Sequence, residues 1–280
     1  WGRNFLIFFG SIGAWFFEGG NLNRQAIAML MLAFMLTCMV AAVNYIINEI
    51  LDAPFDAKHP TKQFRAIPQG LVSIPVLMGL GALLLVGSLP LSGWLINIPT
   101  AITLAGFFGA GIIYNVAPFR FKDVPFLDVI SESVNNPVRF LIGWYAWGAT
   151  FFPSVLLLIC FWAFGAMLMS ARRLGEKHTL SPQDAKNYRS TFAVYTSRSL
   201  QAQYAIYALI SITLFSFSSM IYHKILLLFL PVLLIFIIWL FRLSAHKVPG
   251  EINGNWQSYR NFLPFAIFMI VIFFILLLWN

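Results

Sequence analysis

Long apolar stretches separated by short polar segments dominate this sequence. Nine of them are nearly free of charge: 4–18, 25–51, 70–89, 94–114, 126–150, 152–171, 191–219, 224–243 and 259–279. About 20 apolar residues in a helix cross the ~30 Å hydrocarbon core of a bilayer. The pattern therefore predicts an all-α fold, a polytopic transmembrane helical bundle of about nine helices, with eight or ten as alternatives. No soluble insertion or linker interrupts it, so we expect a single domain over 1–280.

The composition excludes a soluble protein. Hydrophobic residues make up 60% of the chain and charged residues 10%, whereas soluble domains carry about a quarter charged residues. The chain starts at Trp1, so we expect a trimmed N-terminus, and the first apolar stretch is not followed by a small-residue cleavage site. Cys38 and Cys160 lie in the middle of separate stretches, which favours neither a disulfide nor a zinc site.

The basic residues are unevenly distributed between the connecting segments. Connections after the second, fourth, sixth and eighth stretches carry Lys58, Lys62, Arg65, Arg120, Lys122, Arg172, Arg173, Lys177, Lys186, Arg189, Arg242 and Lys247. The opposite side carries only Arg24 and Lys224. This asymmetry predicts that the basic connections face the cytoplasm. We attribute the net charge of +8 to topology and an anionic ligand, and expect no nucleic acid partner.

A first polar cluster lies at the end of the second stretch. Asn44, Asn48 and Asp52 are spaced four residues apart and share one helix face. Pro54 is expected to end or kink the helix, so that Asp56 projects from the turn beyond it. Such oxygen ligands suit Mg²⁺, which binds one or two carboxylates and leaves its other positions to water and phosphate. The alternative is an ordinary helix end beside a solvated loop.

Three basic residues follow this cluster. Lys58, Lys62 and Arg65 would supply positive charge to the anion that the metal binds. Acidic groups near a membrane helix are costly and persist mainly where a function needs them. We therefore interpret the whole segment as a candidate metal and phosphate site.

A second polar cluster opens the fifth stretch. It comprises Asp128, Glu132, Asn135, Asn136 and Arg139, whose offsets of 4, 7, 8 and 11 keep them near one helix face. We expect Arg139 to bind an anion and the carboxylates to orient its guanidinium. The alternative is an internal salt bridge that only satisfies this arginine within the bundle.

A third cluster, largely basic, ends the sixth stretch. Arg172, Arg173 and Glu176 lie there, and Arg189 and Tyr195 follow in the connection and at the start of the seventh stretch. Arginine presents a planar fork that suits phosphate. The alternative is charge that only sets the topology of a helix end.

The first cluster supports a family resemblance. Asn48-Glu49-x-x-Asp52-x-x-x-Asp56 resembles the first aspartate-rich motif of the UbiA superfamily of intramembrane prenyltransferases, with Glu49 where that family usually has aspartate. The resemblance extends over essentially the whole chain in helix number, loop sidedness and motif position. It implies a nine-helix bundle that binds Mg²⁺ and a diphosphate at its cytoplasmic mouth.

The third cluster points to one branch of that superfamily. Prenyltransferases usually carry a second aspartate-rich motif at the end of the sixth helix, where this chain has Arg172-Arg173-x-x-Glu176. This resembles the Lys-Arg-x-x-Glu of the decaprenyl-phosphate phosphoribosyltransferase branch. Trp1-Gly-Arg3-Asn4, Asp52-x-x-x-Asp56-x-x-His59-Pro60-x-Lys62, and Asp128 with Arg139 and Gly143 are similar to further patterns of the branch. After the first motif the chain departs from it, since Ala66-Ile67-Pro68 follows Arg65.

The resemblance implies transfer of phosphoribose from phosphoribosyl diphosphate to a polyprenyl phosphate in a bacterial inner or plasma membrane. The runner-up moves a prenyl group from a prenyl diphosphate to an aromatic or isoprenoid acceptor. A third interpretation, a non-catalytic transporter or assembly partner, predicts that Asp52→Asn leaves function intact. Homo-oligomerisation is left open.

The same resemblance implies roles for individual residues. Asn48, Asp52 and Asp56 are expected to hold Mg²⁺ and to be catalytic. The expected substrate-binding residues are Arg3, Asn44, Lys58, Lys62, Arg65, Lys122, Asp128, Glu132, Arg139, Arg172, Arg173, Glu176, Arg189 and Tyr195.

Overall fold

The computed structural model describes residues 2–18, 24–57, 62–179, 190–245 and 262–279. These residues form helices and connecting turns without any strand, which confirms the predicted all-α class. The chain divides into two compact units, 1–154 and 155–280, and we describe each by itself. The prediction of a single domain stays a prediction.

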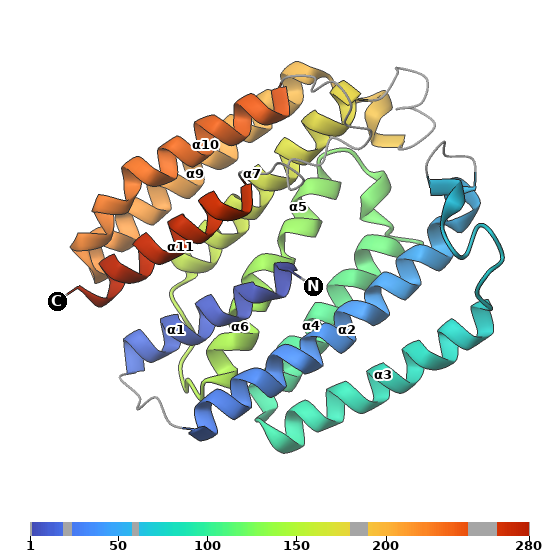
Figure 1. Cartoon of the computed structure of the whole chain (residues 1–280), viewed down its shortest axis with the longest axis horizontal. Helices are drawn as coiled ribbons and strands as arrows, with labels where there is room; N and C mark the ends of the chain where they lie inside the picture. The colour runs from blue at the N-terminus through green and yellow to red at the C-terminus, as the bar shows by residue number, and fades with distance from the viewer. Residues whose placement is uncertain (1, 19–23, 58–61, 180–189, 246–261, 280) are drawn as a thin grey trace. The chain divides into compact units, whose positions relative to one another are not determined.

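The first unit contains the helices numbered up to α6 (Figure 1). In chain order these are η1 (Gly2–Phe5), α1 (Leu6–Glu18), α2 (Arg24–Asp56), η2 (Lys62–Phe64), α3 (Ile74–Leu95), α4 (Ile98–Asn115), η3 (Phe121–Asp123), α5 (Leu127–Ser133) and α6 (Asn135–Ala146). Its apolar core is formed by side chains such as Ile7, Leu36, Val40, Leu104 and Ile142.

The second unit contains the remaining helices (Figure 1). They are α7 (Val155–Thr179), η4 (Ser190–Ala193), α9 (Ser197–Tyr222), η5 (Lys224–Phe229), α10 (Leu230–Ala245) and α11 (Phe262–Leu278). Met167, Tyr204, Phe236 and Leu240 lie in its core, where the Tyr204 hydroxyl donates to the carbonyl of Ile237 at 2.7 Å. A buried tyrosine is thereby satisfied without water.

Each of the nine predicted stretches contains helix, but their lengths differ. Within the described residues, six helical segments are long and apolar enough to cross a membrane: 24–56, 74–95, 98–115, 155–178, 197–222 and 224–245. Helices α1, α6 and α11 have 13, 12 and 17 residues. The fifth stretch is divided between α5 and α6 because Pro137 has no N–H to donate to the preceding turn.

Of the two outcomes expected at Pro54, an end of α2 is wrong, whereas a kink stays a prediction. Pro54 lies inside α2, and Asp56 is the last helical residue rather than part of a turn beyond the helix. A proline in the last turn removes only its own hydrogen bond. The next turn is still closed, since the N–H of Ala57 donates to the carbonyl of Ala53 at 3.0 Å.

Helices α1 and α6 approach each other unusually closely. A Cβ atom built on Gly10 would lie 1.8 Å from the carbonyl oxygen of Phe140, and one built on Gly143 would lie 1.8 Å from that of Ile7. The Ser11 hydroxyl donates to the carbonyl of Gly143 at 3.0 Å across the same contact. Small residues allow this backbone approach between membrane helices, and the contact holds α1, which follows Arg3 and Asn4, against α6.

Candidate active site

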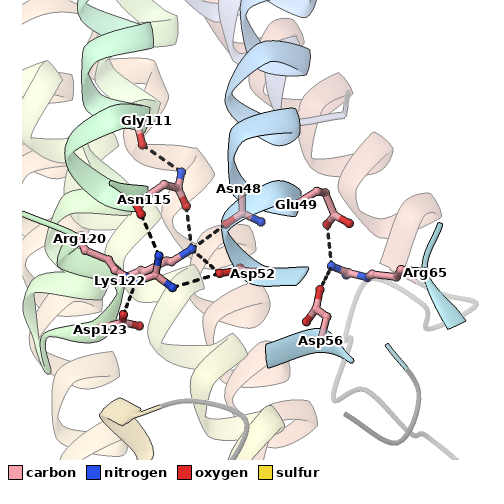
Figure 2. A network of polar contacts seen from close by, with 10 residues as sticks. All are labelled: Asn48, Glu49, Asp52, Asp56, Arg65, Gly111, Asn115, Arg120, Lys122 and Asp123. Carbon is pink, nitrogen blue, oxygen red and sulfur yellow. Dashed lines mark hydrogen bonds and ion pairs between the residues drawn. The ribbon is translucent and has the colours of Figure 1, made fainter. Parts of the chain in front are cut away.

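Three side-chain oxygens converge on the ammonium of Lys122 in the first unit (Figure 2). Its Nζ donates to Asp52 Oδ1 at 2.6 Å, Asn48 Oδ1 at 3.2 Å and Asn115 Oδ1 at 3.2 Å. Asn48 and Asp52 come from the last turns of α2, and Asn115 is the last residue of α4. We call these three oxygen-bearing residues the oxygen triad.

Lys122 is itself a buried group. It is 5% exposed, on the short 3₁₀ helix that follows α4. Burial lowers the pKa of its ammonium below the ordinary value, although the hydrogen bond and the charge of Asp52 oppose that shift. Burying a charged amine is costly unless its N–H groups form hydrogen bonds. The oxygen triad accepts three hydrogen bonds from the Lys122 ammonium.

Arg120 lies beside the triad. Its Nη2 donates to Asp52 Oδ1 at 3.4 Å, its Nη1 to the carbonyl of Asn115 at 3.2 Å and its Nε to Asp123. Its backbone is left-handed, with φ of 37°, an unusual conformation for a residue with a Cβ. The Asp52 carboxylate therefore faces two cationic groups, of which only the arginine is partly open to solvent.

A separate ion-pair group lies on another face of α2 (Figure 2). The Arg65 guanidinium donates to Glu49 at 2.6 Å and to Asp56 at 2.8 Å. Glu49 and Asp56 are seven residues apart and so lie within roughly 20° of each other around the helix. Burial alone would lower the pKa of Arg65, but the charges of the two carboxylates outweigh it and raise that pKa.

The structure therefore does not bring the three predicted metal ligands together. Asn48 and Asp52 meet in the oxygen triad, whereas the Asp56 carboxylate points to Arg65 (Figure 2). No cluster of three or more histidine, cysteine or acidic side chains suited to a metal occurs within the part of the chain that the structure describes.

Asn44 lies deeper along the same helix. Its Nδ2 donates to the carbonyl of Phe107 at 3.2 Å, while its Oδ1 is buried without a hydrogen-bond partner. A Cβ on Gly111 would lie 2.3 Å from the Asn44 amide. Glycine at position 111 thus allows α4 to pack against a polar side chain of α2.

The second polar cluster forms around Arg139. The guanidinium donates to Asn4 Oδ1 at 2.8 Å and to the carbonyl of Asn135 at 3.2 Å, and it lies 4.6 Å from the centre of the Phe107 ring. Arg3 instead pairs with Glu132 at 2.6 Å.

That the carboxylates orient Arg139 stays a prediction, since Glu132 pairs directly with Arg3 while its charge also acts on the Arg139 guanidinium. No ion pair to Arg139 is found among the residues that the structure describes. The sequence analysis placed the whole second cluster on one face of a single helix. That helix is interrupted between α5 and α6. Asp128 is fully buried in the first turn of α5.

The third cluster belongs to the second unit. Glu176 accepts from Arg172 Nε at 3.0 Å through one oxygen and from Arg173 Nη1 at 2.9 Å through the other. Arg173 is 1% exposed, whereas the Arg172 side chain is 46% exposed. Tyr195 is buried and its carbonyl accepts from Lys177. The C-terminal end of α7 thus carries a buried ion pair between Arg173 and Glu176, and Arg172 remains accessible to solvent.

Some predicted residues cannot be placed, and others were missed. Lys58 and Arg189 lie outside the described residues, and of Lys62 only the backbone, in η2, is described. Asn115 and Arg120 were not among the candidates, although Asn115 ends α4 and Arg120 lies two residues before Lys122 in the connection that follows. The sequence does contain a signal for them, because Asn115 ends an apolar stretch shortly before the basic residues Arg120 and Lys122.

Comparison with known proteins agrees with this fold. The sequence model of the UbiA prenyltransferase family matches residues 6–263, so the chain belongs to that family. The predicted superfamily is thereby confirmed.

Two curated relatives bear the name decaprenyl-phosphate phosphoribosyltransferase. The protein from Mycolicibacterium smegmatis is 28% identical over 204 residues, which cover 72% of this chain and 61% of the relative. The protein from Corynebacterium glutamicum is 24% identical over 95% of this chain and 71% of the relative. The chain thus spans less than two thirds of the first of these proteins.

Solved structures share the fold. A UbiA homologue from Archaeoglobus fulgidus bound to GPP and Mg²⁺ matches with a TM-score of 0.71 at 18% identity, covering 98% of this chain and 95% of the other. A homologue from Aeropyrum pernix matches with a TM-score of 0.68 at 14% identity, covering 96% and 97%.

Proposed function

We propose that this protein is a Mg²⁺-dependent membrane transferase that moves phosphoribose from phosphoribosyl diphosphate to a polyprenyl phosphate. The observation that carries the choice of donor is the end of α7, where Arg172, Arg173 and Glu176 stand in place of a second acidic motif. The two relatives from Mycolicibacterium and Corynebacterium are named for this reaction. The basic connections are taken to face the cytoplasm, where a soluble donor is available.

The residues of the oxygen triad fit a magnesium ion. Asn48, Asp52 and Asn115 offer one carboxylate and two amide oxygens around a point that a cation already occupies in the form of the Lys122 ammonium. Mg²⁺ prefers oxygen ligands and uses one or two carboxylates. When bound, it neutralises charge on the diphosphate leaving group. Asp56 remains a proposed ligand, although its carboxylate holds Arg65 in this structure.

The basic side chains of the same unit would bind the donor. Lys122 and Arg120 flank Asp52, and Arg65 stands at the end of the same helix beside Asp56. Positive groups aimed at the charge that develops on the departing diphosphate lower the barrier of such a step. Lys58 and Lys62 are proposed to complete this set.

The acceptor phosphate needs a second set of cations. Arg3 and Arg139 in the first unit are proposed to hold it. Arg172, Arg173 and Arg189 in the second unit are proposed to bind substrate as well. An oxygen of the polyprenyl phosphate bonds to the anomeric carbon of the ribose as the bond to diphosphate breaks. The nucleophile is already an anion, so no general base is required. Exclusion of water protects the oxocarbenium-like centre from hydrolysis.

A prenyltransferase is the second candidate. The Archaeoglobus homologues were solved with the prenyl diphosphates GPP and DMAPP together with Mg²⁺, and the family bears that activity in its name. Under this alternative the oxygen triad has the same role, but the electrophile is an allylic carbon and the acceptor an aromatic or isoprenoid compound.

The test is transfer of label by the purified protein in proteoliposomes. Ribose-labelled phosphoribosyl diphosphate and a polyprenyl phosphate should give a labelled lipid that depends on Mg²⁺. Geranyl diphosphate with an aromatic acceptor should give no product. Asp52→Asn is the control, and it should abolish the signal. Turnover of the prenyl diphosphate without incorporation of ribose would reject the proposed donor in favour of the second candidate.

A further inference from the structure

Lys122 occupies the position in which a bound cation would contact the oxygen triad. Its Nζ lies 2.6 Å from Asp52 Oδ1 and 3.2 Å from both Asn48 Oδ1 and Asn115 Oδ1. The residue is 5% exposed. The carboxylate of the triad is therefore already paired with a cation of the chain itself.

An ammonium and a divalent metal cannot both use this site. Mg²⁺ binds oxygen at 2.0–2.1 Å, so a metal in contact with Asp52 and the two amides would lie too close to Nζ for the ammonium to stay where it is. Two cations this close also repel each other strongly in a site with little solvent. Arg120, at 3.4 Å from Asp52, adds further positive charge. Metal entry without a compensating anion is therefore opposed by both space and charge.

A diphosphate changes this balance. It brings several negative charges to the metal, and it offers the displaced ammonium new oxygen acceptors. Lys122 sits on a three-residue helix in the connection after α4 rather than within a long helix, so its side chain can exchange partners without disturbing the bundle.

We propose that Lys122 is a built-in counter-cation that excludes divalent metal from the oxygen triad until a diphosphate arrives, and that Asn115 is a ligand of that metal. The inference deepens the proposed function, because it rests on the triad being the metal site. It predicts an order of events: metal and diphosphate bind together, and the free protein has little affinity for the metal alone.

The test measures metal binding rather than activity. The full chain in detergent is dialysed against Mn²⁺ with and without inorganic diphosphate, and protein-retained metal is counted by electron paramagnetic resonance after acid release. Wild type should retain Mn²⁺ only when diphosphate is present. Lys122→Met should bind Mn²⁺ without diphosphate at least tenfold more tightly than wild type. Lys122→Gln, which keeps a polar group beside Asp52, is the second variant and should behave in the same way.

Matched controls separate the site from general charge effects. Lys224→Met removes one positive charge from an exposed position in the second unit, and it should bind Mn²⁺ as wild type does. In the Lys122→Met background, Asp52→Asn should abolish the gained affinity and Asn115→Ala should reduce it at least threefold. A full gain that survives Asn115→Ala would remove Asn115 from the ligand set.

The outcomes distinguish this inference from the proposed function. Equal Mn²⁺ affinity of wild type and both Lys122 variants without diphosphate would overturn the counter-cation role while leaving phosphoribosyl transfer untouched. Retention of no metal by any variant, with or without diphosphate, would overturn both the inference and the magnesium site. Normal metal behaviour without ribose transfer would reject only the proposed donor.

Discussion

The contact between α1 and α6 gives the sharpest prediction for the scaffold of the site. In Gly143→Ala, the new Cβ would lie 1.8 Å from the carbonyl oxygen of Ile7, against about 3.4 Å for an ordinary contact, so the helices must separate by about 1.6 Å (3.4 minus 1.8). That shift breaks the 3.0 Å hydrogen bond from Ser11 to the carbonyl of Gly143.

The cost follows from three opposing effects. Overpacking costs about 1–3 kcal/mol, and the lost hydrogen bond adds about 1 kcal/mol. The higher helix propensity of alanine returns about 1 kcal/mol. We therefore expect Gly143→Ala to lower the free energy of unfolding of the first unit by about 1–3 kcal/mol, with a drop in Tm of about 2–4 °C per kcal/mol.

A buried thiol provides the assay. The Asn4 side chain donates to Cys38 Sγ at 3.2 Å, so displacement of the segment before α1 uncovers this cysteine. In a Cys160→Ser background, a thiol-reactive dye reports on Cys38 alone, since the chain has two cysteines. Gly143→Ala should show faster labelling below Tm as well as a lower Tm.

The matched control is Gly106→Ala in α4, where no atom lies within 4 Å of the added Cβ. It should leave both readouts unchanged or raise Tm slightly. If Gly143→Ala and Gly106→Ala give the same Tm and the same labelling rate, the close approach of α1 and α6 and the reasoning built on it are wrong.

The remaining predictions concern the polar clusters. Asp52→Asn should lower transfer at least ~100-fold because it weakens the metal site, whereas Asp123→Asn, on a side chain 43% exposed, should cost less than tenfold by the same product assay. Arg173→Met leaves Glu176 with one partner fewer in a buried site and should destabilise the second unit by about 3 kcal/mol in detergent unfolding. Arg172→Met, on the exposed side, should cost less than about 1 kcal/mol, and equal losses would contradict the burial difference. EDTA should abolish transfer, and added Mg²⁺ should restore it; activity that survives chelation would rule out the metal.

The apolar stretches predicted the helices well, because a bilayer leaves a chain few alternatives to satisfying its backbone within each helix. The ends of the helices were less predictable. Pro54 is tolerated in the last turn of α2, where only one hydrogen bond is lost, whereas Pro137 coincides with the division between α5 and α6. Both are prolines near polar residues, and their different effects depend on packing that the sequence does not display.

The candidate site was predicted in part for the same reason. Spacing along one helix placed Asn48 and Asp52 on one face, which the structure confirms. The spacing did not predict that Asp56 and Glu49 both pair with Arg65. These two carboxylates are seven residues apart and share a helix face of their own, which competes with the four-residue spacing near the helix end. Lys122 meets Asp52 from 70 residues away, and such a partner depends on how α2 packs against α4.

Phe107 in α4 contacts both polar clusters of the first unit, the one that begins at Asn44 and the one around Arg139. Its carbonyl accepts from Asn44, and its ring lies under the Arg139 guanidinium at 4.6 Å. A ligand that moves α4 at one cluster therefore changes the environment of the other. Occupancy of one site should be measurable as altered affinity at the second, with the same coupling free energy in both directions. Donor and acceptor would then bind as thermodynamically linked ligands, even without touching a residue in common.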